Sequence, residues 1–302
     1  MKYYRTIRSG TQHRLAVETE SGRLADLTSI DESLDDLNVL VTEASLSGAS
    51  IDSYTQKLLE SGSAETLSIE QVVEDSRHKT GDTWLNRPFD FSEVWAAGVT
   101  YKTSEMERRR ESDTPDVYSK VYTADRPELF LKATSDRCVG PFDSVGIRGD
   151  STWNVPEPEL VFVLSEGQII GYTAGNDMSS RSIEGENPLY VPQAKVFDRC
   201  CAIGPCFVTA TTISDPHNLM IYCTICRDGS EVFSGQASTS QMARKCWDLA
   251  EWLQRHNTIP ILTPVFTGTS IVPPSGFTLE EGDSITIDID GIGKLENNVV
   301  IV

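Results

Sequence analysis

Two short apolar runs joined by a tight-turn sequence constrain this chain more than any other feature. Residues 160–164 are apolar and favour a strand, residues 165–167 are Ser-Glu-Gly, and residues 168–173 supply a returning strand. Glycine at the end of a three-residue hairpin loop accepts the positive φ required there. We therefore predict a β-hairpin in which Leu164 pairs with Gln168, a register that places residue 155 opposite Asp177.

Three carboxylates gather at the open end of this hairpin. Glu157 and Glu159 are two residues apart, which places both side chains on one face of a strand. In the predicted register Asp177 lies diagonal to Glu157, about 7–8 Å away between backbones. Such crowded charges favour a bound cation, and oxygen-only ligands favour Mg²⁺, Mn²⁺ or Ca²⁺ over zinc. The alternative is a set of solvated acids, of which this chain has many.

The net charge disfavours two classes of partner. With 45 acidic and 26 basic residues in 302, the formal net charge is -19, which argues against nucleic acid and anionic membranes. The sequence contains no apolar run near the ~20 residues of a membrane-spanning helix and no signal-type segment after Met1. The chain is therefore expected in the cytoplasm.

The seven cysteines indicate reduced thiols, since an odd number in a chain without a secretory signal does not predict a disulfide framework. Four of them stand among apolar residues and are expected to be buried: Cys200, Cys201, Cys206 and Cys246. Cys223 and Cys226 have no second pair at zinc-finger distance. The four histidines have polar neighbours and are expected at the surface.

The pattern of apolar residues divides the chain into a small N-terminal α/β domain, residues 1–85, and a β-rich domain, residues 86–302. The first contains expected strands at 3–7 and 14–18 and expected helices at 33–45 and 53–60. The second is dominated by short strands between Gly, Pro, Asp and Asn turns. The fold class is therefore α+β.

Two helices are expected within the β-rich domain. Residues 103–111 are crowded with charge and have almost no apolar stripe, which is typical of a weakly packed lid or of an ordinary solvated helix. Residues 238–256 begin with a possible capping box formed by Ser238 and Gln241. Its two tryptophans, Trp247 and Trp252, are expected in the core.

The sequence lacks the motifs of several enzyme classes: the Gly-x-Ser-x-Gly elbow, the P-loop and the Gly-x-Gly-x-x-Gly turn are all absent. The carboxylates instead suggest metal-assisted chemistry on a substrate that chelates through two oxygens. A 2-oxo acid does so through its carboxylate and keto oxygens, and the metal then stabilises the enolate that forms when a C3 proton leaves.

Several motifs resemble the fumarylacetoacetate hydrolase superfamily over roughly residues 90–302. They are Pro-Glu-Pro-Glu-Leu at 156–160, Gly-Tyr-Thr at 171–173, Asn-Asp-Met-Ser-Ser-Arg at 176–181, and Gln-Ala-Lys at 193–195 followed by Gly-Pro at 204–205. Residues 126–134, 137–140 and 186–193 are more similar to one branch, the 2-keto-3-deoxy-D-arabinonate dehydratases, and the N-terminal part is similar to theirs as well.

The resemblance implies a mixed β-roll that carries the active site, a homo-oligomer such as a dimer or tetramer, and a set of site residues. It implies Mg²⁺ as the cofactor, with Mn²⁺ or Ca²⁺ as alternatives. Metal ligands would be Glu157, Glu159 and Asp177; catalytic groups Lys195 and Glu128; and substrate-binding residues Arg126, Lys132, Thr267, Gly268 and Thr269. Either Lys195 or Glu128 would remove the C3 proton, and the other would protonate the leaving hydroxyl.

Two positions depart from the superfamily pattern. Ser104 stands where many of its hydrolases have a histidine that activates water, and Ser182 stands where an aspartate usually follows Arg181. Without that histidine, elimination of water is favoured over hydrolysis. The expected reaction is dehydration of a 2-keto-3-deoxy pentonate to 2,5-dioxopentanoate. A C–C bond hydrolase acting on an acylpyruvate or fumarylacetoacetate is the second hypothesis, and an inert metal-binding or ligand-sensing protein is the third.

Overall fold

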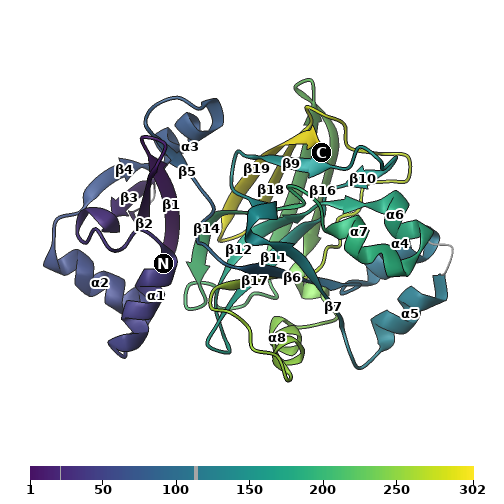
Figure 1. Cartoon of the computed structure of the whole chain (residues 1–302), viewed down its shortest axis with the longest axis horizontal. Helices are drawn as coiled ribbons and strands as arrows, with labels where there is room; N and C mark the ends of the chain where they lie inside the picture. The colour runs from purple at the N-terminus through teal and green to yellow at the C-terminus, as the bar shows by residue number, and fades with distance from the viewer. Residues whose placement is uncertain (21, 112–114) are drawn as a thin grey trace.

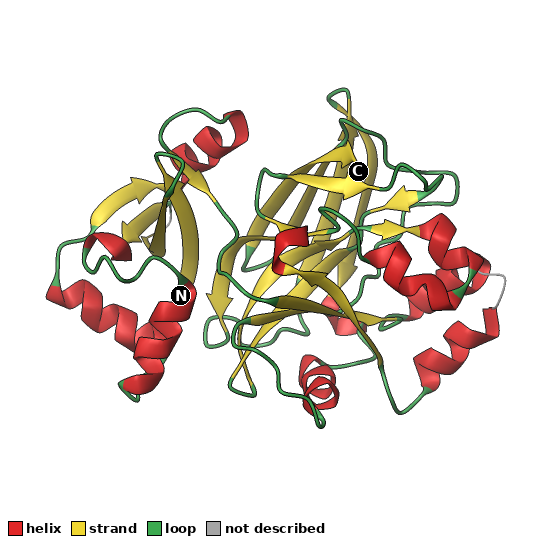
Figure 2. Cartoon of the chain, in the orientation of Figure 1, coloured by secondary structure: helices red, strands yellow, loops and turns green. Residues whose placement is uncertain are grey.

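The computed structural model describes residues 1–20, 22–111 and 115–302. Strands dominate it, and Figure 2 shows the helices on the outside of the strands. The expected β-rich α+β architecture is confirmed. Among the described residues, no helix is both long and apolar enough to cross a membrane.

A mixed sheet of 12 strands runs the length of the molecule in the order β4-β3-β2-β1-β14-β12-β11-β17-β6-β7, with β5 beside β1 and β8 beside β14. Its strands are β1 (Lys2–Arg8), β2 (Gln12–Glu20), β3 (Arg23–Asp26), β4 (Glu65–Ser68), β5 (Thr83–Leu85), β6 (Glu93–Gly98), β7 (Glu128–Thr134), β8 (Cys138–Val139), β11 (Pro158–Ser165), β12 (Gln168–Asp177), β14 (Cys201–Thr209) and β17 (Thr263–Phe266).

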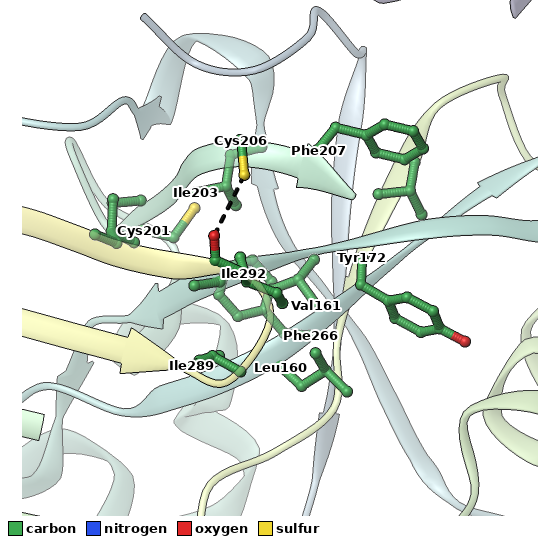
Figure 3. Close-up of a cluster of buried hydrophobic side chains, with 14 of the residues drawn as sticks. Leu160, Val161, Tyr172, Cys201, Ile203, Cys206, Phe207, Phe266, Ile289 and Ile292 are labelled. Atoms are coloured by element: carbon green, nitrogen blue, oxygen red, sulfur yellow. Dashed lines mark hydrogen bonds between the residues drawn. The ribbon is translucent and has the colours of Figure 1, made fainter. Parts of the chain in front are cut away.

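A second sheet of five strands, in the order β16-β15-β18-β19-β9, faces part of the large one. It comprises β9 (Ser144–Ile147), β15 (Met220–Arg227), β16 (Ser230–Ser238), β18 (Ser284–Ile289) and β19 (Gly293–Ile301), and a separate pair is formed by β10 (Asn154–Val155) and β13 (Ser179–Ser180). Side chains from both sheets share one core, in which the Cys206 thiol donates to the Ile292 carbonyl (Figure 3).

The helices form three groups, visible in Figure 1. Beside the N-terminal strands are α1 (Leu37–Leu46), α2 (Ile51–Ser61) and α3 (Ile69–His78); beside the open end of the hairpin are α4 (Lys102–Glu111), α5 (Pro115–Thr123), α6 (Arg181–Glu186) and α7 (Val191–Lys195); and α8 (Cys246–Gln254) lies apart from both. Short 3-10 turns occupy Leu27–Ser29, Ser135–Arg137, Pro188–Tyr190 and Thr239–Gln241.

The N-terminal strands continue the large sheet. β1 pairs antiparallel with β14, with Lys2 opposite Val208 and Tyr3 opposite Phe207. The expected strands and helices of this region are present with shifted bounds, because Asp36 and Ser50 cap α1 and α2 by accepting backbone N–H bonds. The domain boundary at residue 85 stays a prediction, since hydrogen bonds of the sheet cross between the two parts.

The β11–β12 hairpin forms, but the predicted register is wrong. Its loop has two residues, Glu166 and Gly167, and both have positive φ, as a type I′ turn requires. A bulge at Ile170 then shifts the pairing by one more residue. Glu157 and Asp177 consequently exchange two backbone hydrogen bonds, of 3.1 and 2.9 Å, and lie directly opposite each other.

The expected helix at 238–256 is shorter than predicted. β16 continues to Ser238, which caps the following 3-10 turn, and α8 begins only at Cys246. His217, expected at the surface, is buried, and its Nε2 accepts the backbone N–H of Cys246 at 3.1 Å. Trp247 is also not in the core, because 61% of its surface is exposed.

Candidate active site

The structure brings Glu157, Glu159 and Asp177 together at the open end of the hairpin. One oxygen from each carboxylate lies within 4.8 Å of the others, and all three residues are buried. The pairing of Glu157 with Asp177 places their side chains on one face of the sheet, and Glu159 follows two residues later on that face. Three oxygens at this spacing are suitable ligands for one hard divalent cation.

The loop after β17, residues 267–269, contacts Glu159 and the backbone of β11. The N–H of Gly268 donates to Glu159 Oε2 at 2.6 Å. Gly268 has φ +89°, and a Cβ there would lie 2.1 Å from Thr100 Oγ1, so a larger residue does not fit without rearrangement. The hydroxyls of Thr267 and Thr269 donate to backbone carbonyls of β11 at 2.8 and 2.9 Å. These contacts indicate that the loop positions a metal ligand.

Two lysines neutralise the carboxylates. Lys195 Nζ lies 2.8 Å from Glu157 Oε2 and 3.1 Å from Asp177 Oδ2. Lys132 Nζ lies 2.9 Å from Asp177 Oδ1 and also donates to the carbonyls of Met178 and Lys195. Because an ammonium has three N–H groups, these acceptors match all the donors of Lys132, which is fully buried. Lys132 therefore holds Asp177 in place.

Two arginines and a further glutamate complete the charged cluster, and we did not predict their roles from sequence. Glu157 Oε1 lies 2.8 Å from the guanidinium of Arg108 on α4 and 3.1 Å from that of Arg181 on α6. Arg108 also lies 2.7 Å from Glu184 Oε2. A sequence signal existed for Glu184, since it stands one helical turn after the motif arginine. Arg108 has no such signal, because it is one charged residue among several.

The surrounding charges shift the pKa values of the two triad glutamates in opposite directions. Burial strongly raises the pKa of Glu159, and the nearby carboxylates of Asp177 and Glu157 raise it further. Burial also acts to raise the pKa of Glu157, but its ion pairs with Lys195 and Arg108 outweigh that effect and hold the pKa below its usual value. The cluster is therefore short of positive charge beside Glu159, where a divalent cation would be most favourable.

Glu128 begins β7 and lies across from Gly98 on β6. A Cβ at position 98 would lie 2.1 Å from Glu128 Oε2, so the absence of a side chain at Gly98 makes room for the carboxylate. Burial raises the pKa of Glu128 to about 7, with Glu184 adding to the effect and Arg108 and Lys195 opposing it. At neutral pH this carboxyl can both accept and release a proton.

Arg126 is not brought into this cluster. Its side chain is exposed, and its guanidinium lies 4.7 Å from the centre of the Trp252 ring on α8. The Arg255 guanidinium lies over the same ring at 3.6 Å. This arrangement is a surface cation–π contact with α8.

Replacing Lys132 with methionine should lower the free energy of unfolding by about 3–5 kcal/mol, because a buried carboxylate loses one of its two cations. Urea denaturation in the presence of a chelator would measure the loss. Lys57→Met on α2 is the control, since Lys57 is exposed. A loss below about 1 kcal/mol, the range of exposed pairs, would contradict the supporting role of Lys132.

Several known proteins are similar to this chain over most of its length. The family described as "Fumarylacetoacetate (FAA) hydrolase C-terminal" matches residues 93–300. A probable 2-keto-3-deoxyxylonate dehydratase of Haloferax volcanii is 49% identical over 100% of both chains. A 2-dehydro-3-deoxy-D-arabinonate dehydratase of Saccharolobus solfataricus is 44% identical over 71% of this chain and 74% of its own length.

The fold similarity extends over the whole chain. A 2-keto-3-deoxy-D-arabinonate dehydratase, solved in complex with magnesium and 2,5-dioxopentanoate, has a TM-score of 0.85 and 33% sequence identity, and the match covers 100% of this chain and 99% of that one. The match therefore includes the N-terminal part of this chain as well as its β-rich part.

Proposed function

Because the chain belongs to the fumarylacetoacetate hydrolase family, we propose that it is a lyase that removes water from a 2-keto-3-deoxy pentonate and yields 2,5-dioxopentanoate. The observation that carries the proposal is the buried triad of Glu157, Glu159 and Asp177. Two relatives, 49% and 44% identical to this chain over the aligned residues, are named for such a dehydration, and the structural neighbour was solved with this product.

The residues of the triad fit a magnesium ion. All three are carboxylates, which suit hard cations, and they leave coordination positions for a chelating substrate. Mn²⁺ and Ca²⁺ have similar ligand preferences and are alternatives. When bound, the cation would polarise the C2 carbonyl of a 2-oxo acid and make a C3 proton more acidic.

We assign the movement of the C3 proton to Glu128, whose pKa of about 7 suits it to general acid–base catalysis at neutral pH. We assign departure of the C4 hydroxyl to Lys195, since two of its three N–H groups match Glu157 and Asp177 and the third can donate to a substrate oxygen. Loss of the C3 hydrogen with the C4 hydroxyl gives water and a C3–C4 double bond. Transfer of a hydrogen from C5 to C3 then gives an enol with a C4–C5 double bond, and movement of the enol hydroxyl proton to C4 yields the C5 aldehyde.

The position of Ser104 supports dehydration over hydrolysis. Ser104 lies on α4 and is buried, and its hydroxyl is too weak a base to activate water as a histidine would. Elimination requires no activated water, so it is compatible with serine at this position.

Gly98→Ala should lower kcat by about 10- to 100-fold while metal affinity stays within about twofold of the wild type, because the new methyl group displaces the Glu128 carboxylate and leaves the triad intact. Steady-state kinetics and calorimetric titration of Mg²⁺ would measure both. Unchanged kcat would show that the position of Glu128 does not matter to the reaction.

Incubation of the protein and Mg²⁺ with a panel of 2-keto-3-deoxy acids tests the proposed reaction directly. We expect a C5 aldehyde product from a 2-keto-3-deoxy pentonate and no cleavage of an acylpyruvate. Cleavage of the acylpyruvate with no aldehyde from any panel member would favour the hydrolase hypothesis.

Three broader features remain proposals. We propose a cytoplasmic location because all seven cysteines are unpaired. A homo-oligomer agrees with exposed apolar side chains such as Leu189 and Trp247, which are 83% and 61% exposed.

The division into domains of residues 1–85 and 86–302 would be tested by limited proteolysis near residue 85.

A further inference from the structure

The buried face of α4 is polar. Over residues 102–110, whose side chains the structure describes, the buried residues are Ser104, Glu105 and Arg108, and their spacing places them on one side of the helix. Met106 is the only apolar residue of α4, and 44% of its surface is exposed. Apolar packing of its own side chains therefore contributes little to holding α4 over the site.

Arg108 instead ties α4 to two other elements. Its guanidinium lies 2.8 Å from Glu157 Oε1, just before β11, and 2.7 Å from Glu184 Oε2 on α6. All three residues are buried, at 5–7% exposure, so water screens these ion pairs weakly. The pairs are charge-assisted hydrogen bonds, which are stronger than neutral ones.

One of these partners is also a ligand of the triad. A divalent cation held by Glu157, Glu159 and Asp177 would share the negative charge that attracts Arg108, and it would repel the guanidinium. Glu157 is also contacted by Arg181, which lies on α6, and by Lys195, which lies on α7. Arg108 is the cation of this cluster that α4 carries.

We propose that Arg108 couples the charge at Glu157 to the position of α4. A divalent cation at the triad weakens the pair between Arg108 and Glu157 and loosens α4. A 2-oxo acid then brings its carboxylate close to Glu157. Arg108 pairs with that carboxylate, and the pair again holds α4 over the occupied site. The response to the acid rests on the proposed function, whereas the response to the cation alone does not.

Hydrogen exchange of the full chain, read in peptides that cover residues 101–111, tests this coupling in three conditions: a chelator, Mg²⁺, and Mg²⁺ with 2-oxobutyrate. That acid has no C4 hydroxyl to lose, so the complex does not turn over. We expect amides of α4 to exchange about tenfold faster with Mg²⁺ than with the chelator, which corresponds to about 1.4 kcal/mol, and to slow again with 2-oxobutyrate.

Arg108→Met should exchange rapidly in all three conditions. It should also bind Mg²⁺ about tenfold more tightly, because a competing positive charge is gone; a variant with a merely damaged site would bind the metal more weakly. Arg110→Met is the matched control, since Arg110 lies on the same helix, is exposed and pairs with Glu107 of that helix. It should behave as the wild type.

Wild-type exchange that does not respond to Mg²⁺, or an Arg108→Met variant whose metal affinity is unchanged or lower, would overturn the proposal. The outcome is separable from that of the proposed reaction. If α4 responds to the metal but no dehydration occurs, the role of Arg108 holds and the lyase assignment fails. If dehydration occurs but α4 does not respond to the metal, the lyase assignment holds and the role of Arg108 fails.

Discussion

Glu159→Gln should abolish Mg²⁺-dependent stabilisation and lower turnover by at least about 10³-fold, because the triad loses the carboxylate with the least compensating positive charge. Glutamine keeps the shape of the side chain, and its amide oxygen can still accept the N–H of Gly268. The free energy of unfolding in a chelator should therefore not fall. Removal of one of three crowded negative charges should instead raise it slightly.

Thermal unfolding with chelator and with Mg²⁺ would measure both effects. Glu166→Gln is the control, since Glu166 lies in the turn of the same hairpin and is exposed. An unfolding temperature of Glu159→Gln that still rises with Mg²⁺ as the wild type does would show that the cation binds elsewhere.

Glu128→Gln should lower kcat by about 10²–10⁴-fold, the range that a general acid–base group contributes, while Mg²⁺ affinity stays nearly unchanged. Wild-type kcat should also change near pH 7, because burial raises the pKa of Glu128 to about 7. Any residual turnover of the variant should lack that change. Unaltered kcat in the variant would remove Glu128 from the mechanism.

The raised pKa of Glu128 also predicts how stability depends on pH. Between about pH 4.5 and 7 the folded protein retains a proton that the unfolded chain has released. This group therefore makes the metal-free protein less stable as the pH rises through that range, and Glu128→Gln should reduce the effect. Urea denaturation at several pH values, with a chelator present, would measure the difference.

The hairpin shows why its register was mispredicted and its carboxylates were still placed on one face. The sequence indicates a turn at residues 165–167 but does not distinguish a two-residue loop from a three-residue one, nor does it reveal the bulge at Ile170. Each error shifts the pairing by one residue. Because side chains alternate between faces with a period of two, the two shifts together return Asp177 to the face of Glu157.

Other residues could not be placed because their partners are distant in sequence. Arg108 contacts Glu157, 49 residues away, and its own helix resembles an ordinary solvated one. Lys132 contacts Asp177, the carbonyl of the adjacent Met178 and the carbonyl of Lys195 on α7, and no local pattern predicts these contacts. His217 is polar and was expected at the surface, yet the start of α8 requires an acceptor there. Local patterns identify strands, turns and motifs, whereas such contacts depend on tertiary packing.

Anomalous diffraction from crystals that contain Mn²⁺ and 2-oxobutyrate tests the central claim most directly, since Mn²⁺ takes the same oxygen ligands as Mg²⁺ and scatters anomalously. We predict one strong peak within about 2.0–2.3 Å of an oxygen from each of Glu157, Glu159 and Asp177, with the carboxylate and keto oxygens of the acid completing its coordination. A peak at another site, or an acid bound without contact to the metal, would contradict the account.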